Sequence, residues 1–288
     1  MCSQGLVVGH RGCRGYPGIP ENSLASFKYA IERGAAAIEL DCRLTKDGEV
    51  VVIHDDHTWR LTHQKQSISS LTLAEVRKLT YRLPDGHETS ESIPTLHEVM
   101  QLVSHHNVKV FIEIKCSDWS ATAVPLAQKV AALIKEFSAH KWACVIAFNP
   151  SVLYRIRLID HEIETCMLFC ENYFESAATS NLETVSFFLR FRWVYRALDP
   201  LMMILCKHVF PELIGCTMIG PHYHLTHPRD VHSYKKRGFG TYVWVPNTPT
   251  DSQFYLDVGC SVGTDCVFPK TCHRGLRSSA ENVKVCDD

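Results

Sequence analysis

Three acidic residues and a lysine occupy alternating positions in two short apolar segments. Glu39 and Asp41 alternate with apolar neighbours, as do Glu113 and Lys115 farther along the chain. Successive side chains of a strand point to opposite faces, so an apolar face that meets outer helices turns these charged groups inward. Carboxylates crowded in a core are costly unless a cation neutralises them, and Mg²⁺ and Ca²⁺ prefer oxygen ligands. The acids predict a divalent metal site, with Lys115 as a cation for phosphate. A buried salt bridge between Lys115 and one acid is the alternative.

Two histidines stand where apolar runs end. His10 precedes Arg11 and Gly12, and His54 follows the run 51–53. An imidazole, with a pKa of about 6.5, exchanges protons readily near neutral pH. We predict that one histidine removes a proton from the attacking oxygen and the other protonates the leaving group, although the sequence does not assign the two roles. The planar guanidinium of Arg11 suits two phosphate oxygens. These residues predict chemistry at a phosphate ester.

The elements that position these residues alternate between short β-branched runs and amphipathic segments of helical length. This pattern is typical of parallel strands joined by crossover helices, and eight strands is the number in a TIM (β/α)8 barrel. The expected strands are 6–11, 37–43, 108–115, 144–149, 164–170, 216–221, 240–245 and 261–267. The carboxyl ends of barrel strands carry the active site, and both histidines are expected there.

We expect a single domain over 1–288, with the barrel core at about 5–271. Two insertions interrupt its alternation of strands and helices. The first, 51–94, follows the second strand and contains an extra apolar run, a helix beginning near Thr72 and a polar turn at 84–86. The second, 171–215, follows the fifth strand. Aromatic and basic residues interleave over 184–214, which suits helices that rest on lipid headgroups. Helices that form a lid over the barrel rim are the alternative.

Composition narrows the class of protein. The chain is 45% hydrophobic and 21% charged, and its net charge of -1 gives no general attraction to nucleic acid, so we expect no nucleic-acid partner. Thirteen cysteines, several inside apolar runs, suit buried thiols better than a disulfide framework, and the pair Cys166 and Cys170 lacks a second pair at zinc-finger spacing. No signal peptide or membrane-spanning helix is predicted. We expect a cytoplasmic or peripherally membrane-associated protein.

Several motifs occur together at a characteristic spacing. Those near the start are His10-Arg11-Gly12, Pro20-Glu21-Asn22, Glu39-Leu40-Asp41, Thr45-Lys46-Asp47-Gly48 and Val52-Ile53-His54-Asp55. Those farther on are Ile112-Glu113-Ile114-Lys115, Ala147-Phe148-Asn149-Pro150, Val243-Trp244 and Thr264-Asp265. In these motifs the chain resembles the glycerophosphodiester phosphodiesterase family, and its long hydrophobic insertion resembles the membrane-associated animal branch. Departures from the usual family pattern at Ser23, Ala147 and Pro246 remove no proposed catalytic atom, but Pro246 bears on substrate preference.

The resemblance implies a TIM barrel that hydrolyses glycerophosphodiesters to an alcohol and glycerol 3-phosphate with one divalent cation, Mg²⁺ or Ca²⁺. It implies metal ligands at Glu39, Asp41 and Glu113, acid–base catalysis by His10 and His54, and phosphate or substrate contacts by Arg11, Lys115, Glu21, Asn22 and Trp244. Two alternatives stay open. The same centre would act as a lysophospholipase D on lysophospholipids, releasing lysophosphatidic acid, if the pocket near Trp244 accepted an acyl chain. The barrel would be a catalytically inactive membrane-bound scaffold if its reacting residues did not function, because fold alone does not imply activity.

Overall fold

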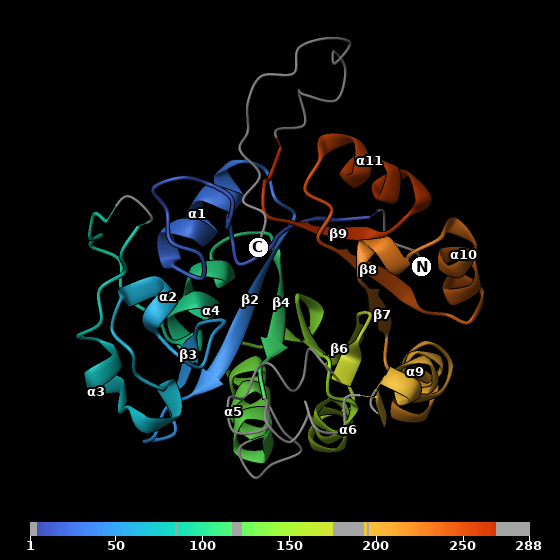
Figure 1. Ribbon diagram of the computed structural model, residues 1–288, viewed down its shortest axis with the longest axis horizontal. Coiled ribbons are helices and arrows are strands. Elements are labelled where there is room, and N and C mark those ends of the chain that lie inside the picture. The colour runs from blue at the N-terminus through green and yellow to red at the C-terminus, as the bar shows by residue number, and fades with distance from the viewer. Residues whose placement is uncertain (1–4, 84–85, 117–122, 175–192, 195, 269–288) are drawn as a thin grey trace.

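The computed structural model describes residues 5–83, 86–116, 123–174, 193–194 and 196–268 (Figure 1). Its central feature is a ring of parallel strands: β1 (Val7–Gly9), β2 (Ala37–Leu44), β4 (Lys109–Ile114), β5 (Ala143–Ala147), β6 (Glu164–Phe169), β7 (Met218–Pro221), β8 (Gly240–Trp244) and β9 (Ser261–Thr264). The order is β1-β9-β8-β7-β6-β5-β4-β2, and pairing of β1 with β2 closes the ring. Each strand overlaps one of the eight expected runs, so the TIM-barrel prediction is confirmed.

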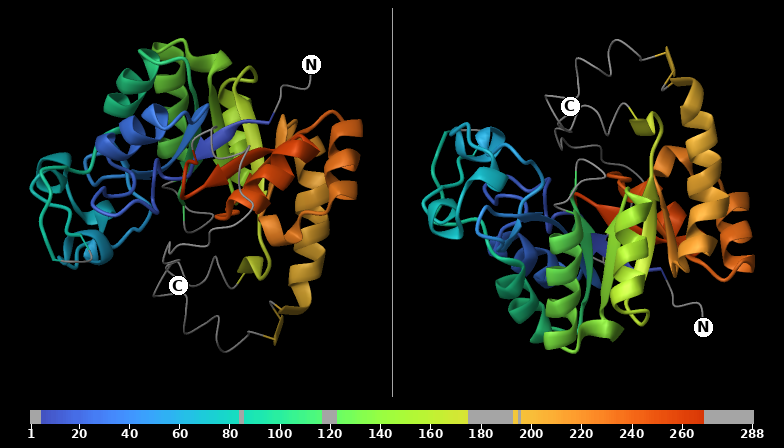
Figure 2. Two further views of the ribbon diagram at one scale, coloured as in Figure 1. Left: turned by 90° about the horizontal axis from the view of Figure 1, so that it is seen from above. Right: turned by 90° about the horizontal axis from the view of Figure 1, so that it is seen from below.

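Helices surround the strands on the outside (Figure 1, Figure 2). They are α1 (Leu24–Glu32), α4 (Leu96–Ser104), α5 (Ala123–Glu136), α6 (Pro150–Ile159), α9 (Phe210–Ile214), α10 (Pro228–Lys236) and α11 (Pro249–Val258), with short turns η2 (Ala139–Lys141) and η4 (Tyr223–Leu225). Several begin at a residue whose side chain accepts a hydrogen bond from the first turn, namely Ser23, Thr95, Asn149 and Thr248. These caps define where the loops at the carboxyl ends of the strands end.

The alternation of side chains along the strands divides the core into two layers. Ile38 and Leu40 of β2 and Ile112 of β4 pack in the outer layer, between strands and helices. Inside the barrel, Phe111 and Tyr242 stack with ring centroids 4.8 Å apart. The inward face predicted for the acids is therefore the interior of the barrel, above an apolar layer that closes its lower part. Seven of the ten described cysteines are buried.

The first insertion forms a small layer beside the barrel. It consists of β3 (Val50–Val52), antiparallel to β2, followed by α2 (Trp59–Thr62), η1 (Ile68–Ser70) and α3 (Leu73–Val76). The helix expected near Thr72 is α3, and Thr72 caps it. Residues 84 and 85 of the expected turn lie outside the described part. A separate apolar cluster that includes Ile53, Ile68 and Tyr81 holds this layer together, so α2 has a fixed place next to the barrel.

The second insertion follows β6, and residues 175–192 and 195 of it lie outside the described part. From 196 onward the chain is helical, continues through the π-turn η3 (Leu205–Val209) and ends in α9. This helix runs along the outside of the barrel, on the side opposite the first insertion (Figure 2). Within the described residues no helix combines the length and the apolar character needed to cross a membrane.

Candidate active site

The three acids predicted as metal ligands meet inside the mouth of the barrel. Parallel pairing of β2 with β4 sets Asp41 opposite Glu113, and Glu39 lies two residues before Asp41. Carboxylate oxygens of the three residues lie within 4.8 Å of one another, and all three side chains are buried. Within the described structure, Oε1 of Glu39 has no hydrogen-bond partner. An unpartnered buried oxygen in a set of oxygen donors fits a divalent cation.

The pKa shifts of the three acids also favour a bound divalent cation. Burial, reinforced by Asp41 and Glu113, raises the pKa of Glu39 well above its usual range. Burial also raises the pKa of Glu113, against the opposing effect of Lys115. Burial alone would raise the pKa of Asp41 as well, but Lys115, His54 and Arg11 outweigh it and hold that pKa well below its usual range. The three carboxyl groups thus carry more potential negative charge than the neighbouring cationic side chains neutralise. A divalent cation would neutralise the remainder.

Lys115 and Arg11 border this cluster. Nζ of Lys115 lies 2.7 Å from Oε1 of Glu113 and 3.2 Å from Oδ1 of Asp41, so the salt bridge considered as an alternative is present together with the unpartnered oxygen of Glu39. Arg11 has a left-handed backbone, with φ of 50°, and its N–H donates to Oε2 of Glu39 at 2.8 Å. Its Nη1 donates to Glu21 at 2.9 Å, and Nε lies 3.4 Å from Asp41.

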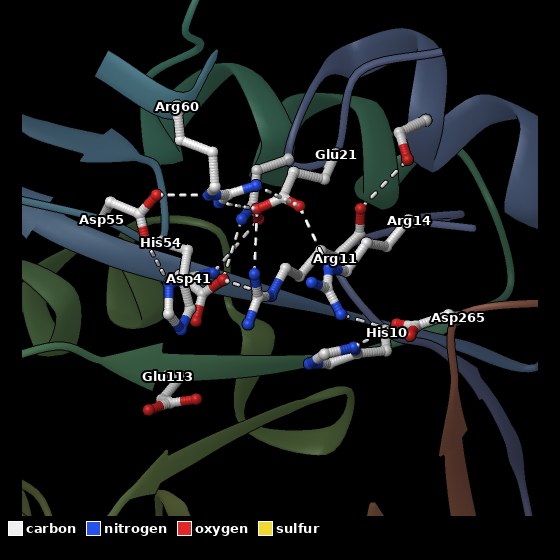
Figure 3. Close-up of polar contacts among 12 residues, drawn as sticks. His10, Arg11, Arg14, Glu21, Asp41, His54, Asp55, Arg60, Glu113 and Asp265 are labelled. Atoms are coloured by element: carbon white, nitrogen blue, oxygen red, sulfur yellow. Dashed lines mark hydrogen bonds and ion pairs between the residues drawn. The ribbon is translucent and has the colours of Figure 1, made fainter. Parts of the chain in front are cut away.

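His10 is held by an aspartate from the far end of the chain (Figure 3). Its Nδ1 lies 2.6 Å from Oδ1 of Asp265, and its Nε2 lies 3.8 Å from Glu39. Asn247 donates to Asp265 at 2.8 Å. Burial would raise the pKa of Asp265, but His10, Arg14 and Asn247 hold it well below the usual range. A carboxylate at Nδ1 retains the proton there and leaves Nε2 facing the acids.

His54 has a matching arrangement on the other side of the cluster (Figure 3). Its Nδ1 lies 2.7 Å from Oδ1 of Asp55, and its carbonyl accepts a hydrogen bond from Nε of Arg43 at 2.8 Å. Burial, together with the positive charge of Lys115, lowers the pKa of His54 to about 4. His54 is therefore a neutral imidazole at pH 7 with one nitrogen fixed by a carboxylate, which is the state that a proton acceptor needs.

The remaining predicted residues fall into two groups. Asn22 is buried and donates to Oδ2 of Asp41 at 2.8 Å, while Glu21 is buried among three arginines. Trp244, at the end of β8, lies in an aromatic wall: its ring meets Phe148 at 5.4 Å and His222 at 4.8 Å between centroids, both edge to face. The structure thus brings Asn22 into contact with a predicted metal ligand and Glu21 into contact with a predicted phosphate-binding arginine. It sets Trp244 against other aromatic side chains at the mouth.

Several residues at the site were not predicted from the sequence. Asp55 and Asp265 belonged to motifs that the sequence displays, so their positions beside the histidines could have been proposed. Arg14, Arg60 and Asn247 carried no such signal, because each acquires its partner only through folding. Phe148 and His222 directly follow strands β5 and β7, and only barrel geometry reveals that they share a wall.

Comparison with known proteins identifies the family of the chain. The glycerophosphoryl diester phosphodiesterase family matches residues 10–268. The chain belongs to this family. A glycerophosphodiester phosphodiesterase from Caldanaerobacter subterraneus is 36% identical over 57% of this chain and 66% of its own length. Glycerophosphodiester phosphodiesterase 1 from Bos taurus is 28% identical over 91% of this chain and 78% of its own. As a member of the family, the chain is a phosphoric diester hydrolase.

Solved structures of the family share the fold. A glycerophosphodiester phosphodiesterase from Thermotoga maritima superimposes with a TM-score of 0.64 at 26% identity, over 92% of this chain and 96% of its own. A phosphodiesterase from Oleispira antarctica, solved in complex with the product sn-glycerol-3-phosphate, gives 0.69 at 20% identity over 93% and 95%. The family barrel therefore extends over nearly all of the chain.

Proposed function

We propose that this phosphodiesterase hydrolyses glycerophosphodiesters to an alcohol and glycerol 3-phosphate, with one divalent cation held by Glu39, Asp41 and Glu113. The observation that carries the proposal is a buried three-carboxylate cluster between two histidines, each with an aspartate on Nδ1. The product found in the Oleispira relative supports the class of substrate.

A bound Mg²⁺ or Ca²⁺ would polarise a phosphate oxygen as a Lewis acid. The protein's own cations, Arg11 and Lys115, border the carboxylates and contact the non-bridging oxygens of a phosphate placed there. Asn22, by its hydrogen bonds to Asp41, keeps that carboxylate in one orientation. Trp244 packs against the glycerol or the headgroup.

The two histidines move the protons. One removes a proton from water or from the glycerol hydroxyl, and the other protonates the departing alcohol, each through the Nε2 that its aspartate leaves exposed to the substrate. Asp265 and Asp55 accept the Nδ1–H of the two rings, so the base begins the step as a neutral imidazole with a free Nε2, and the acid begins it as an imidazolium with a proton on Nε2. Turnover close to the native value in His54→Ala would contradict this scheme.

The decisive assay follows release of glycerol 3-phosphate from glycerophosphodiesters and lysophospholipids in Mg²⁺, in Ca²⁺ and in EDTA. We expect turnover that EDTA and Glu39→Ala both abolish, while Glu49→Ala, a half-exposed acid near Lys129, keeps it. Release of lysophosphatidic acid instead would favour the lysophospholipase D alternative. No product with any metal would favour the inactive scaffold.

A second proposal concerns peripheral contact of the described part of 184–214 with a lipid surface. Its described residues leave large apolar side chains uncovered: Trp193 is 73% exposed, Leu201 53%, Ile204 55% and Leu213 73%. Arg196 and Lys207 lie on the helical stretch that is described from residue 196 onward, and interleaved apolar and basic side chains suit a lipid headgroup layer.

Vesicle co-sedimentation tests this contact. Leu201→Lys combined with Ile204→Lys should release the protein from vesicles that contain anionic lipid. Leu158→Lys, on α6 and 68% exposed, is the matched control and should leave binding unchanged. Equal binding of all variants, with turnover changed only in the double variant, would instead favour the lid.

A further inference from the structure

A continuous chain of charged groups links the two histidines (Figure 3). On one side it runs from His54 to Asp55 at 2.7 Å, to Arg60 at 2.6 Å and to Glu21 at 2.7 Å. On the other side Glu21 lies 3.2 Å from Arg14, which lies 3.4 Å from Asp265, the partner of His10. Glu21 also accepts from Arg11 at 2.9 Å, so this one carboxylate joins both halves of the site.

Arg60 contacts the carboxylate partner of His54, which is Asp55, and the carboxylate partner of Arg11, which is Glu21. Its Nε donates to Oδ2 of Asp55, and its two Nη atoms donate to the two oxygens of Glu21 at 2.7 and 3.1 Å. The planar guanidinium therefore spans two carboxylates from different loops in one rigid unit. A lysine, with a single nitrogen, has no equivalent geometry.

The first insertion holds the backbone of Arg60 in a fixed position. Arg60 belongs to α2, which follows Thr58 and ends at Thr62, and both threonines are buried. The Thr58 hydroxyl donates to the backbone carbonyls of Gln64 and Gln66, which ties the start of α2 to the chain that follows it. The Glu21 side chain is 5% exposed, whereas that of Arg60 is 40% exposed, so the pair lies at the border between the barrel mouth and solvent. Arg60 is near enough to the surface to be replaced without opening a cavity in the core.

We propose that Arg60 is a positioning residue of the active site. It holds Asp55 on Nδ1 of His54 and holds Glu21 against Arg11, so that a proton-transfer group and a phosphate contact keep their orientations together. Among the hydrogen bonds and ion pairs of the described residues, Arg60 bonds directly to neither His54 nor Arg11, and it acts through their carboxylate partners. The inference rests on the proposed function, because it assigns His54 and Arg11 to the substrate.

Arg60→Ala and Arg60→Lys test the assignment in steady-state turnover of a glycerophosphodiester. We expect kcat to fall about 10- to 100-fold in both, the usual loss when a partner that orients a functional side chain is removed, with a thermal midpoint close to that of the native chain. Free guanidinium at millimolar concentration should restore part of the activity of Arg60→Ala but none of that of Arg60→Lys. Arg82→Ala is the matched control, because Arg82 lies in the same insertion and pairs with exposed Glu88 at 2.6 Å.

A second readout does not depend on turnover. Nitrogen chemical shifts of the His54 imidazole at pH 7 report which ring nitrogen carries the proton. The native chain should show the Nδ1–H form, and Arg60→Ala should show a mixture of both tautomers, as Asp55 loses its fixed orientation.

The outcomes separate this inference from the proposed function. Native kcat in Arg60→Ala, or an unchanged His54 tautomer, would overturn the role of Arg60 and leave the proposed function intact. A loss of activity that only follows the folded fraction, without guanidinium rescue, would overturn it as well. If the native chain itself showed no turnover, the proposed function would fail, and the imidazole spectra would still decide whether Arg60 orients His54.

Discussion

Replacing Glu21 by glutamine should lower stability by an amount that depends on pH. Burial would raise the pKa of Glu21, but Arg11, Arg60 and Arg14 outweigh it and lower the pKa from 4.5 to about 2. At ~1.36 kcal/mol per pKa unit this is about 3 kcal/mol of stabilisation from the ionised carboxylate. Because the folded-state pKa is the lower one, that stabilisation is present above pH 4.5 and is lost as the pH falls toward 2.

Urea unfolding followed by tryptophan fluorescence measures the effect. The free energy of unfolding of Glu21→Gln should lie about 3 kcal/mol below that of the native chain at pH 7, and the difference should shrink to roughly 1.4 kcal/mol at pH 3 by the linkage relation. Glu88→Gln, which removes an exposed partner of Arg82, should cost less than about 1 kcal/mol at either pH. A difference for Glu21→Gln that stayed constant from pH 7 to pH 3 would refute the reasoning.

Two further substitutions probe the site. Glu39→Gln should raise the thermal midpoint in EDTA, because it removes a carboxylate whose pKa is raised by burial. It should also abolish any rise that Mg²⁺ or Ca²⁺ produces in the native chain, and a lower midpoint in EDTA would contradict this. Asp265→Asn should lower kcat about 10- to 100-fold by releasing His10, whereas the exposed Asp257→Asn should not; equal kinetics in the two variants would show that Asp265 does not orient His10.

The strand pattern was readable from the sequence because it is a local property. Successive side chains of a strand alternate between its faces whatever the rest of the chain does, so Ile38 and Leu40 identified the outer face and Glu39 and Asp41 the inner one. The same alternation placed Glu113, and the strand count then indicated a barrel. Within the first insertion, the cap at Thr72 was likewise visible, since a helix start depends on a few neighbouring residues.

Contacts between distant segments depend on how the barrel closes. His10 and Asp265 are 255 positions apart, and they meet because β1 pairs with β9 in a register that sets Gly9 opposite Thr264. Arg60 reaches Glu21 only because the first insertion packs next to the mouth on its own small core. Such contacts depend on strand register and on the packing of whole elements. Neither has a signature in the residues that finally touch, which is why Glu21 and Arg11 were found in advance and the other partners of Glu21, Arg14 and Arg60, were not.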